Sequence, residues 1–500
     1  MSFATDSPVH SSSSDDFAAL IDAEFEVGSS GSSPDEQDNE EDEVDADSDD
    51  DDGDDEEDDS NDDLNDHRKK RCKTEKLDDL EGPQGSTSQG LIEEKLEVSL
   101  NKDTCTHPGS FGQMCILCGQ RVDDESSVTF GYIHKGLRLG NDEIVRLRST
   151  DMKNLLRHKK LYLVLDLDHT LLNSTQLNHL TAEEEYLKGQ SDSLQDVSKG
   201  SLFMLEFMHM MTKLRPFVRT FLKEASEMFE MYIYTMGDRP YALEMAKLLD
   251  PKKEYFNGRV ISRDDGTQKH QKGLDVVLGQ DSAVVILDDT ENNRTSGQTG
   301  QAISSSFKAI PSPTGLTGHS GPAWTKHKDN LILMERYHFF ASSCRQFGFD
   351  CKSLSQLKSD ESEPDGALAS ILKILRQIHH IFFDELDSDL ASRDVRQVLK
   401  TVRKEVLKDC KIVFSRVFPT KFQPENHLLW KMAEQLGATC STETDSSVTH
   451  VVSMDAGTEK SRWAVKENKF LVHPRWIEAA NFFWQKQPEE NFPVSQTKNQ

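Results

Sequence analysis

The stretch YLVLDLDHTLLNS, at residues 162–174, is a run of aliphatic residues that ends in two carboxylates, Asp166 and Asp168. A near-continuous apolar run of this length is typical of a strand buried on both faces of a parallel sheet. Charged residues are rare in buried positions unless they are paired, so the two aspartates at the end of this strand require an explanation.

Further apolar runs follow in the sequence, and predicted helices separate them. The runs MYIYTMG (231–237) and AVVILDDT (283–290) are short and β-rich. The segments at 215–230 and 239–250 have the apolar spacing of amphipathic helices, and Pro240 suits the first turn of the second one. Strands that alternate with helices predict an α/β domain, a parallel sheet with helices on both faces.

Polar groups stand at the carboxyl end of each predicted strand, where open α/β sheets place their sites. Four clustered carboxylates repel one another unless a cation lies among them, and an oxygen-rich site of this kind suits Mg²⁺. Aspartates also cap turns, which leaves a purely structural interpretation open for any one pair. The coincidence of three strand ends favours one phosphate-handling pocket, formed by Asp166, Asp168, Thr235, Asp288 and Asp289.

These residues carry a family resemblance. DLDHT matches the Asp-x-Asp-x-Thr signature of the haloacid dehalogenase superfamily phosphatases. The combination of DLDHTLLNS, KLRPFVRTFL, IYTMG, SRDDG and VVILDD resembles the RNA polymerase II C-terminal-domain phosphatases, and most closely their plant members with a C-terminal BRCT domain. The resemblance implies a haloacid-dehalogenase-like catalytic domain at 150–347. It also implies a nuclear Mg²⁺-dependent phosphoserine/phosphothreonine phosphatase that acts on the phosphorylated polymerase repeats and so regulates transcription.

The same resemblance assigns roles to individual residues. Asp166 would attack phosphorus and form an aspartyl-phosphate, and Asp168 would serve as general acid and then as general base. Thr235 would donate a hydrogen bond to a phosphoryl oxygen, and Lys272 would neutralise its charge. Further candidates for substrate contact are Arg263 and Thr170. Mg²⁺, with Mn²⁺ or Co²⁺ as substitutes, would be held by Asp166, the backbone carbonyl of Asp168, Asp289 and, through water, Asp288.

A second metal signal lies at 101–125. The segment CTHPGSFGQMCILCG contains a Cys-x-x-Cys knuckle and a Cys-x-His pair, which together offer four ligands to a tetrahedral Zn²⁺. The expected ligands are Cys105, His107, Cys115 and Cys118. A loop of unliganded thiols is the competing interpretation.

The last part of the chain is predicted to form a helical connector at 365–408 and a small α/β domain at 409–495. Four short strands and three helices, in an order that resembles a BRCT domain, are expected in the latter. Trp463 and Trp476 are expected in its core. Ser415 and Lys460 match the positions with which some BRCT domains hold phosphate, although both would also suit a solvated surface.

Charge is distributed very unevenly. Of the 88 acidic residues, 28 precede His67, where no Lys or Arg occurs; the remaining 60 acids face 58 bases. Residues 1–100 are therefore expected to be a disordered acidic tail, in which FAALIDAEFE (17–26) offers a short segment able to fold onto a partner. The basic cluster HRKKRCK (67–73) fits a nuclear import signal or an intramolecular partner for the acidic run.

Several function classes are disfavoured by the sequence. The nearly neutral remainder argues against direct nucleic-acid binding, and the absence of a long apolar run argues against a membrane span. There is no secretory signal pattern, and the scattered cysteines suit a reducing nuclear or cytosolic compartment. Transcription factors are the expected partners of the BRCT domain or acidic tail. Two rivals to a protein phosphatase are a small-molecule phosphatase and a catalytically weak phospho-dependent scaffold.

One segment departs from the family pattern. Residues 293–322, rich in Ser, Gly, Thr and Pro, separate VVILDDTEN from the Trp that the family places soon afterwards. Such a segment should form a flexible insert, and its loop-closure entropy should cost only about 1–2 kcal/mol or less. A lineage-specific insertion and a translated stretch that is normally spliced out both remain open.

Overall fold

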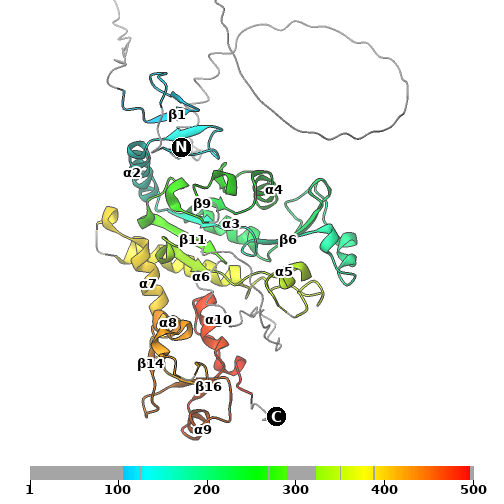
Figure 1. Ribbon diagram of the computed structural model, residues 1–500, viewed down its shortest axis with the longest axis vertical. Coiled ribbons are helices and arrows are strands. Elements are labelled where there is room, and N and C mark those ends of the chain that lie inside the picture. The colour runs from blue at the N-terminus through cyan, green and yellow to red at the C-terminus, as the bar shows by residue number, and fades with distance from the viewer. Residues whose placement is uncertain are drawn as a thin grey trace, which may run out of the picture. The chain divides into compact units, whose positions relative to one another are not determined.

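The computed structural model describes residues 105–122, 127–268, 271–289, 323–349, 351–386, 389–419 and 421–495 (Figure 1). The acidic tail with its basic cluster lies outside these residues, and so does the insert at 293–322.

A five-stranded parallel sheet forms the centre of the catalytic domain. Its strands stand in the order β10-β9-β5-β11-β12, so the three runs predicted from the sequence are adjacent. In register, Val164 of β5 lies opposite Tyr232 of β9 on one side and Ile286 of β11 on the other. The strands are β5 (Leu161–Leu165), β9 (Phe229–Tyr234), β10 (Val260–Ile261), β11 (Val284–Asp288) and β12 (Leu331–Leu333).

Every residue of β5 and β11 is buried, as expected for strands covered on both faces. Helices lie on both faces of the sheet, which confirms the predicted architecture (Figure 1). Helix α4 begins as its sequence predicts, because Pro240 is in its first turn and the Asp238 carboxylate accepts a hydrogen bond from the Tyr241 amide at 3.0 Å. The helices are α2 (Asn141–Arg157), α3 (Val218–Ser226), α4 (Arg239–Leu249), α5 (Ala341–Gln346), α6 (Ala367–His380) and α7 (Val395–Glu405).

The hydrophobic core of this domain extends beyond the central sheet. Side chains from α6 and α7, such as Leu375 and Val398, belong to the same buried cluster as Leu163 and Ile286. The segment expected to be a connector therefore contributes directly to the packing of the catalytic domain. A π-helical turn at Ile381–Glu385 separates the two helices.

Two smaller antiparallel sheets flank the catalytic motif in sequence. The first has the order β2-β1-β4-β3 and precedes α2. The second has the order β6-β8-β7, begins immediately after the DLDHT segment, and pairs Leu172 with Leu214. The strands are β1 (Gly109–Phe111), β2 (Met114–Cys115), β3 (Val128–Thr129), β4 (Leu137–Leu139), β6 (Leu172–Gln176), β7 (Leu202–Leu205) and β8 (Met210–Leu214).

The C-terminal domain has a four-stranded parallel sheet in the order β14-β13-β15-β16. Trp476 is fully buried, as predicted, and Trp463 is partly buried against a smaller cluster. Gly437 has φ +96°, and a Cβ at this position would lie 1.8 Å from the Lys404 carbonyl oxygen, so only glycine fits. The elements are β13 (Lys411–Ser415), α8 (Leu428–Gln435), β14 (Thr439–Ser441), β15 (His450–Ser453), α9 (Glu459–Lys466), β16 (Phe470–Val472) and α10 (Arg475–Phe483).

Among the described residues, no helix combines the length and the apolar character that crossing a membrane requires.

Candidate active site

The candidate site lies where three adjacent parallel strands end. Asp166 directly follows β5, Thr235 directly follows β9, and Asp288 is the last residue of β11. The Asp166 amide donates to the Leu287 carbonyl oxygen at 3.0 Å, which ties the end of β5 to that of β11. All three polar side chains are buried, so the sheet topology brings them together at one edge of the sheet, shielded from solvent.

Lys272 links two of the carboxylates. Its Nζ donates to Asp166 Oδ1 at 2.5 Å and to Asp288 Oδ2 at 2.6 Å. The lysine is itself buried, and its backbone amide donates to the Ala323 carbonyl oxygen at 2.8 Å. Segments before and after the insert, at Lys272 and Ala323, therefore hold the ammonium between the two carboxylates whose charge it balances.

The electrostatics of this cluster call for more positive charge than Lys272 supplies. Burial raises the pKa of Asp166 well above its ordinary value; Lys272 opposes this shift, while Asp288 and Asp289 add to it by repulsion. The pKa of Lys272 is lowered by burial but raised more strongly by Asp166 and Asp288, so the lysine stays charged. Arg336 pairs with Asp289, so the three carboxylates Asp166, Asp288 and Asp289 face two cations and keep an excess of negative charge.

A divalent cation fits this arrangement. Asp166, Asp288 and Asp289 each offer a carboxylate oxygen, and these oxygens lie within 4.8 Å of one another. Oxygen donors of this kind are the ligands that Mg²⁺ prefers. The Asp168 side chain is not in this group.

Asp168 instead faces two hydroxyl groups. The Tyr241 hydroxyl donates to Asp168 Oδ1 at 2.6 Å, and the Thr235 hydroxyl donates to Oδ2 at 3.4 Å. Burial raises the pKa of Asp168, and the hydrogen bond from Tyr241 lowers it in part. Tyr241 was not among the predicted site residues, although its place in the first turn of the helix after β9 was a usable signal.

Hydrogen bonds within the DLDHTLLNS segment fix the turn that carries both aspartates. His169, between Asp168 and Thr170, has φ +64°, and its amide donates to the Leu172 carbonyl oxygen at 2.7 Å. Thr170 is buried and its hydroxyl donates to Asp166 Oδ2 at 3.4 Å. The structure thus places Thr170 against the carboxylate of Asp166.

A buried arginine adds to this support. Arg215 donates to the Thr170 carbonyl oxygen at 3.0 Å and to the Glu335 carbonyl oxygen at 3.0 Å. Its other guanidinium nitrogens donate to the two carboxylate oxygens of Glu361 at 2.9 and 2.7 Å. Arg215 belongs to the KLRPF motif but was not predicted to act at the site.

Two more residues near the carboxylates were missed. The Trp324 indole Nε1 donates to Asp288 Oδ2 at 2.9 Å. Arg336 Nε donates to Asp289 Oδ2 at 2.5 Å, and its guanidinium lies over the ring of Phe347 at 4.2 Å. Neither side chain could be placed beside an aspartate without the fold, because Trp324 lies 36 residues and Arg336 47 residues from its partner.

Arg263, by contrast, is not joined to the carboxylate cluster. Its amide donates to the Gly237 carbonyl oxygen at 2.9 Å, and its half-exposed guanidinium lies 3.9 Å from the Asp264 carboxylate. Among the described residues the guanidinium makes no hydrogen bond with Asp166, Asp168 or Thr235.

The four predicted zinc ligands do come together. One ligand atom from each lies within 4.8 Å of the others, at the hairpin of β1 and β2. Cys105 Sγ is 3.8 Å from Cys115 Sγ, and Cys118 Sγ is 3.4 Å from His107 Nδ1. Burial raises the pKa of Cys115, but hydrogen bonds from Cys118 and His107 outweigh it and lower the pKa to about 6.

In the C-terminal domain, Ser415 is buried and its hydroxyl lies 2.8 Å from the Thr458 hydroxyl, just before α9. Lys460 Nζ donates to the carbonyl oxygens of Phe414 at 3.4 Å and Thr442 at 2.7 Å. Both residues therefore lie around the end of β13, and their polar groups are already engaged within the domain.

Comparisons with known proteins cover both domains. Residues 161–308 match the family described as NLI interacting factor-like phosphatase, and residues 402–480 match the BRCA1 C Terminus (BRCT) domain. The chain is 59% identical over 504 residues to RNA polymerase II C-terminal domain phosphatase-like 4 of Arabidopsis thaliana, an alignment that covers 100% of this chain and 99% of that protein. It is 39% identical over 375 residues to phosphatase-like 3 of the same plant, covering 71% of this chain but 28% of that protein.

A solved structure has the same fold. The structure of Fcp1, described as an essential RNA polymerase II CTD phosphatase, superimposes with a TM-score of 0.50 at 24% identity. This superposition covers 70% of the present chain and 100% of the other.

Proposed function

Because the chain belongs to the RNA polymerase II C-terminal domain phosphatases, which are protein phosphatases, we propose that it dephosphorylates phosphoserine and phosphothreonine in the C-terminal repeats of RNA polymerase II and so regulates transcription. The observation that supports this most strongly is the convergence of Asp168 with the buried side chains of Asp166, Thr235 and Lys272 beside the ends of β5 and β9.

In the first step, the Asp166 carboxylate attacks phosphorus and displaces the serine oxygen of the substrate. Because Thr170 donates to one Asp166 oxygen and Lys272 to the other, the carboxylate has a fixed orientation before substrate binds. The product of this step is an aspartyl-phosphate, which divides hydrolysis into two easier reactions.

Asp168 moves the protons. As a carboxylic acid it protonates the leaving serine oxygen, and as a carboxylate it then takes a proton from the water that attacks the aspartyl-phosphate. Tyr241 and Thr235 hold its two oxygens, so the side chain stays directed toward the pocket. Tyr241 is in this account a positioning residue for the acid/base.

Thr235 donates a hydrogen bond to a phosphoryl oxygen, and Lys272 balances the charge of the phosphoryl group through the reaction. Mg²⁺ is the cofactor of this family, and it supplies charge neutralisation where the nucleophile and the phosphate meet. Asp166, the Asp168 backbone carbonyl and Asp289 would hold it, with Asp288 acting through water and Mn²⁺ or Co²⁺ as substitutes. Arg263, on the exposed segment after β10, remains a candidate for contact with the peptide.

Two alternatives are less well supported. A small-molecule phosphatase would have little use for the appended BRCT domain, which suits macromolecular partners. A phospho-dependent scaffold would not need the acid/base, the lysine and the carboxylates all intact, and this chain retains every one of them.

The mechanism is tested by conservative changes at the two aspartates. Asp166→Asn and Asp168→Asn should each leave a folded protein without measurable turnover of a polymerase-repeat phosphopeptide in the presence of Mg²⁺. Asp142→Asn, on the exposed first turn of α2, is the matched control and should keep full activity. Near wild-type turnover in either site variant would exclude the assigned roles.

The remaining parts of the chain are proposed to bring this activity to its place of action. We assign residues 1–100 and 409–495 to recruitment by the transcription machinery in the nucleus, around a catalytic domain at 150–347 and its connector at 365–408. Ser415 and Lys460 would bind a phosphorylated repeat. The test uses Asp166→Asn protein, which should not consume the peptide. In this background Lys460→Ala should weaken binding of the phosphorylated repeat and leave binding of the unphosphorylated repeat unchanged. If the protein with Lys460 intact binds both peptide forms equally, this role is excluded.

The hairpin at β1 and β2 is proposed to hold one structural Zn²⁺, because three thiols and one imidazole nitrogen, each able to bind Zn²⁺, lie within 4.8 Å of one another. Metal analysis of the purified protein should find one zinc per chain, and Cys118→Ser should reduce it. A chain that is folded, active and free of zinc would exclude the site.

A further inference from the structure

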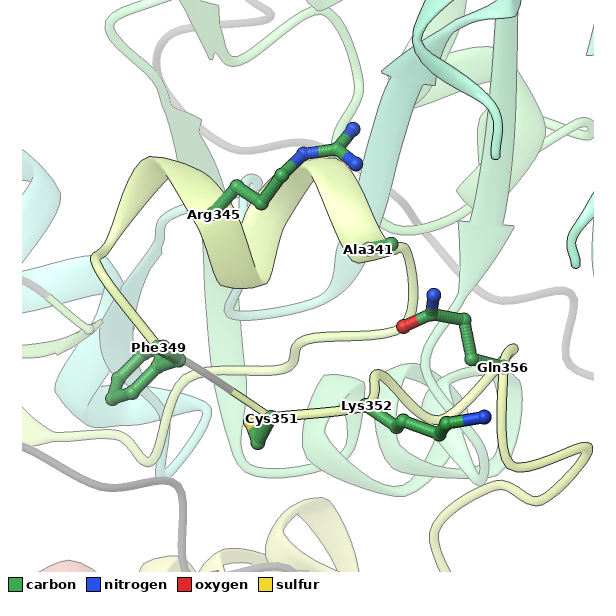
Figure 2. A pocket seen from close by; sticks show the side chains of 6 residues that line it. All are labelled: Ala341, Arg345, Phe349, Cys351, Lys352 and Gln356. Atoms are coloured by element: carbon green, nitrogen blue, oxygen red, sulfur yellow. The ribbon is translucent and has the colours of Figure 1, made fainter. Parts of the chain in front are cut away.

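Two cysteines outside the candidate active site lie at the ends of one short loop. Cys344 is on α5 and is 4% exposed, whereas Cys351 is half-buried and lines a cavity of about 340 Å³. Figure 2 shows Cys351 on the segment that faces α5 across this cavity. The Phe349 amide donates to the Cys344 carbonyl oxygen at 2.9 Å, so the chain turns back on itself, and the two thiols are hydrogen-bonded to each other.

The two thiols have different surroundings. Cys351 is accessible from the cavity, and the cationic residues Arg345 and Lys352 line the same cavity (Figure 2). Lys352 also lies 3.3 Å from Glu183, which takes up part of its charge. Cys351 is therefore the thiol of the pair that a small oxidant can reach from the cavity.

Cys344 has the opposite character. The hydrogen bond with Cys351 and then burial raise the pKa of Cys344, so its thiol stays protonated. The pair thus combines one accessible thiol with one buried thiol in contact with it. This is the arrangement in which oxidation of the first is followed by attack of the second.

The loop between the cysteines contacts the candidate active site through Phe347. The Arg336 guanidinium lies 4.2 Å from the centre of this ring, and the His169 ring meets it edge-on at 5.0 Å. Arg336 is hydrogen-bonded to Asp289, and His169 directly follows Asp168 in the chain. A displacement of Phe347 would therefore affect Asp289 through Arg336 and Asp168 through His169.

We propose that Cys344 and Cys351 form a redox-sensitive pair, in which an intramolecular disulfide displaces Phe347 and lowers the phosphatase activity. Hydrogen peroxide is the oxidant. The Cys351 thiolate attacks one peroxide oxygen, which gives a sulfenic acid and, after proton uptake, water. The Cys344 sulfur then attacks the Cys351 sulfur, the S–O bond breaks, and the proton of the Cys344 thiol passes to the departing oxygen, which leaves as a second water. Two thiols are oxidised by two electrons in all, and one peroxide is reduced.

Only the effect on activity rests on the proposed phosphatase function; formation of the disulfide does not. The proposed nucleophile is a carboxylate, which peroxide does not oxidise. Any reversible loss of activity in peroxide must therefore arise at another residue.

The experiment uses the full-length protein, treated with hydrogen peroxide and quenched with catalase. Peptide mapping should find a disulfide between Cys344 and Cys351. Turnover of a polymerase-repeat phosphopeptide should fall by about tenfold or more, since displacement of reacting groups by about 1 Å can cost about 100-fold. Dithiothreitol should restore it. Cys351→Ser and Cys344→Ala should retain activity in peroxide, whereas Cys440→Ser, in the C-terminal domain, should respond as the wild type does.

Three outcomes would overturn the proposal. The first is the absence of this disulfide from oxidised protein. The second is a disulfide that forms while activity stays unchanged. The third is an equal loss of activity in Cys351→Ser, which would place the sensitive thiol elsewhere, for instance in the hairpin that contains Cys115. A protein without activity before oxidation would instead count against the proposed function, and the mapped disulfide would still decide whether the pair forms.

Discussion

Replacing Tyr241 by phenylalanine removes one hydroxyl group from the candidate active site and leaves the aromatic ring in place. That hydroxyl donates to Asp168 Oδ1 at 2.6 Å and lies 3.0 Å from the Ser174 hydroxyl. The residue is buried in the first turn of α4, so water has little room to replace the lost donor. The substitution therefore tests whether Asp168 depends on Tyr241 for its position.

The expected loss follows from the strength of this hydrogen bond. A hydrogen bond to a charged group contributes about 1.5–3 kcal/mol. If that free energy is lost in the transition state, kcat/KM falls about 10- to 150-fold. The other oxygen of Asp168 keeps only the 3.4 Å contact with Thr235, which compensates poorly. The free energy of unfolding should change by less than about 1.5 kcal/mol, because the ring packing is retained and Ser174 keeps its partner Thr212.

The assay is steady-state hydrolysis of a polymerase-repeat phosphopeptide with saturating Mg²⁺, beside a thermal melt of each protein. Tyr255→Phe is the matched control and should keep full activity. Tyr255 is only partly buried, and its amide donates to the Asp250 carboxylate, which is not among the candidate site residues. If Tyr241→Phe retains more than half of the wild-type kcat/KM while folded, Asp168 is not positioned by this tyrosine.

Three further perturbations have defined outcomes. Lys272→Met removes the ammonium between Asp166 and Asp288, so kcat should fall about 100- to 1,000-fold and metal-free protein should melt at a lower temperature; unchanged kcat would contradict the role of the lysine. Deletion of residues 293–322 keeps Trp324 available to Asp288 and should leave thermal stability and turnover unchanged or raised; a folded but inactive deletion variant would show that the segment belongs to the site. Burial lowers the pKa of His473 from 6.5 to about 4, so this histidine binds a proton more readily when unfolded, and stability present above pH 6.5 is lost as the pH falls toward 4. His473→Gln should remove about 1–2 kcal/mol of this pH dependence from urea unfolding curves, after discounting for the partial exposure of the ring; an identical pH dependence would refute the assignment.

The central sheet could be predicted from the sequence because its signals are local. The aliphatic run before Asp166 and the one that ends at Asp288 specify buried strands by composition alone. Parallel topology then requires that the strand ends meet. The helix at Arg239–Leu249 could be predicted equally well, because Asp238 and Pro240 mark its start.

The supporting residues could not be predicted in the same way. Arg336 reaches Asp289 across 47 positions, and Arg215 reaches Glu361 across 146, so each contact depends on how distant segments pack. The helices at 365–408 were expected to connect two domains because amphipathic spacing shows that a face is buried but not what covers it. In the structure their apolar faces, with residues such as Leu375, complete the core of the catalytic domain.

The central claim is that Asp166 is the nucleophile, and trapping its phosphorylated form tests it most directly. The enzyme is mixed with phosphopeptide and Mg²⁺, quenched in acid, and treated with sodium borohydride, which reduces an acyl phosphate to an alcohol. Mass spectrometry of the peptide that contains DLDHT should show homoserine in place of the aspartate at position 166 and an unmodified Asp168. Modification at any other residue, or none at Asp166 in protein that releases phosphate, would contradict the account.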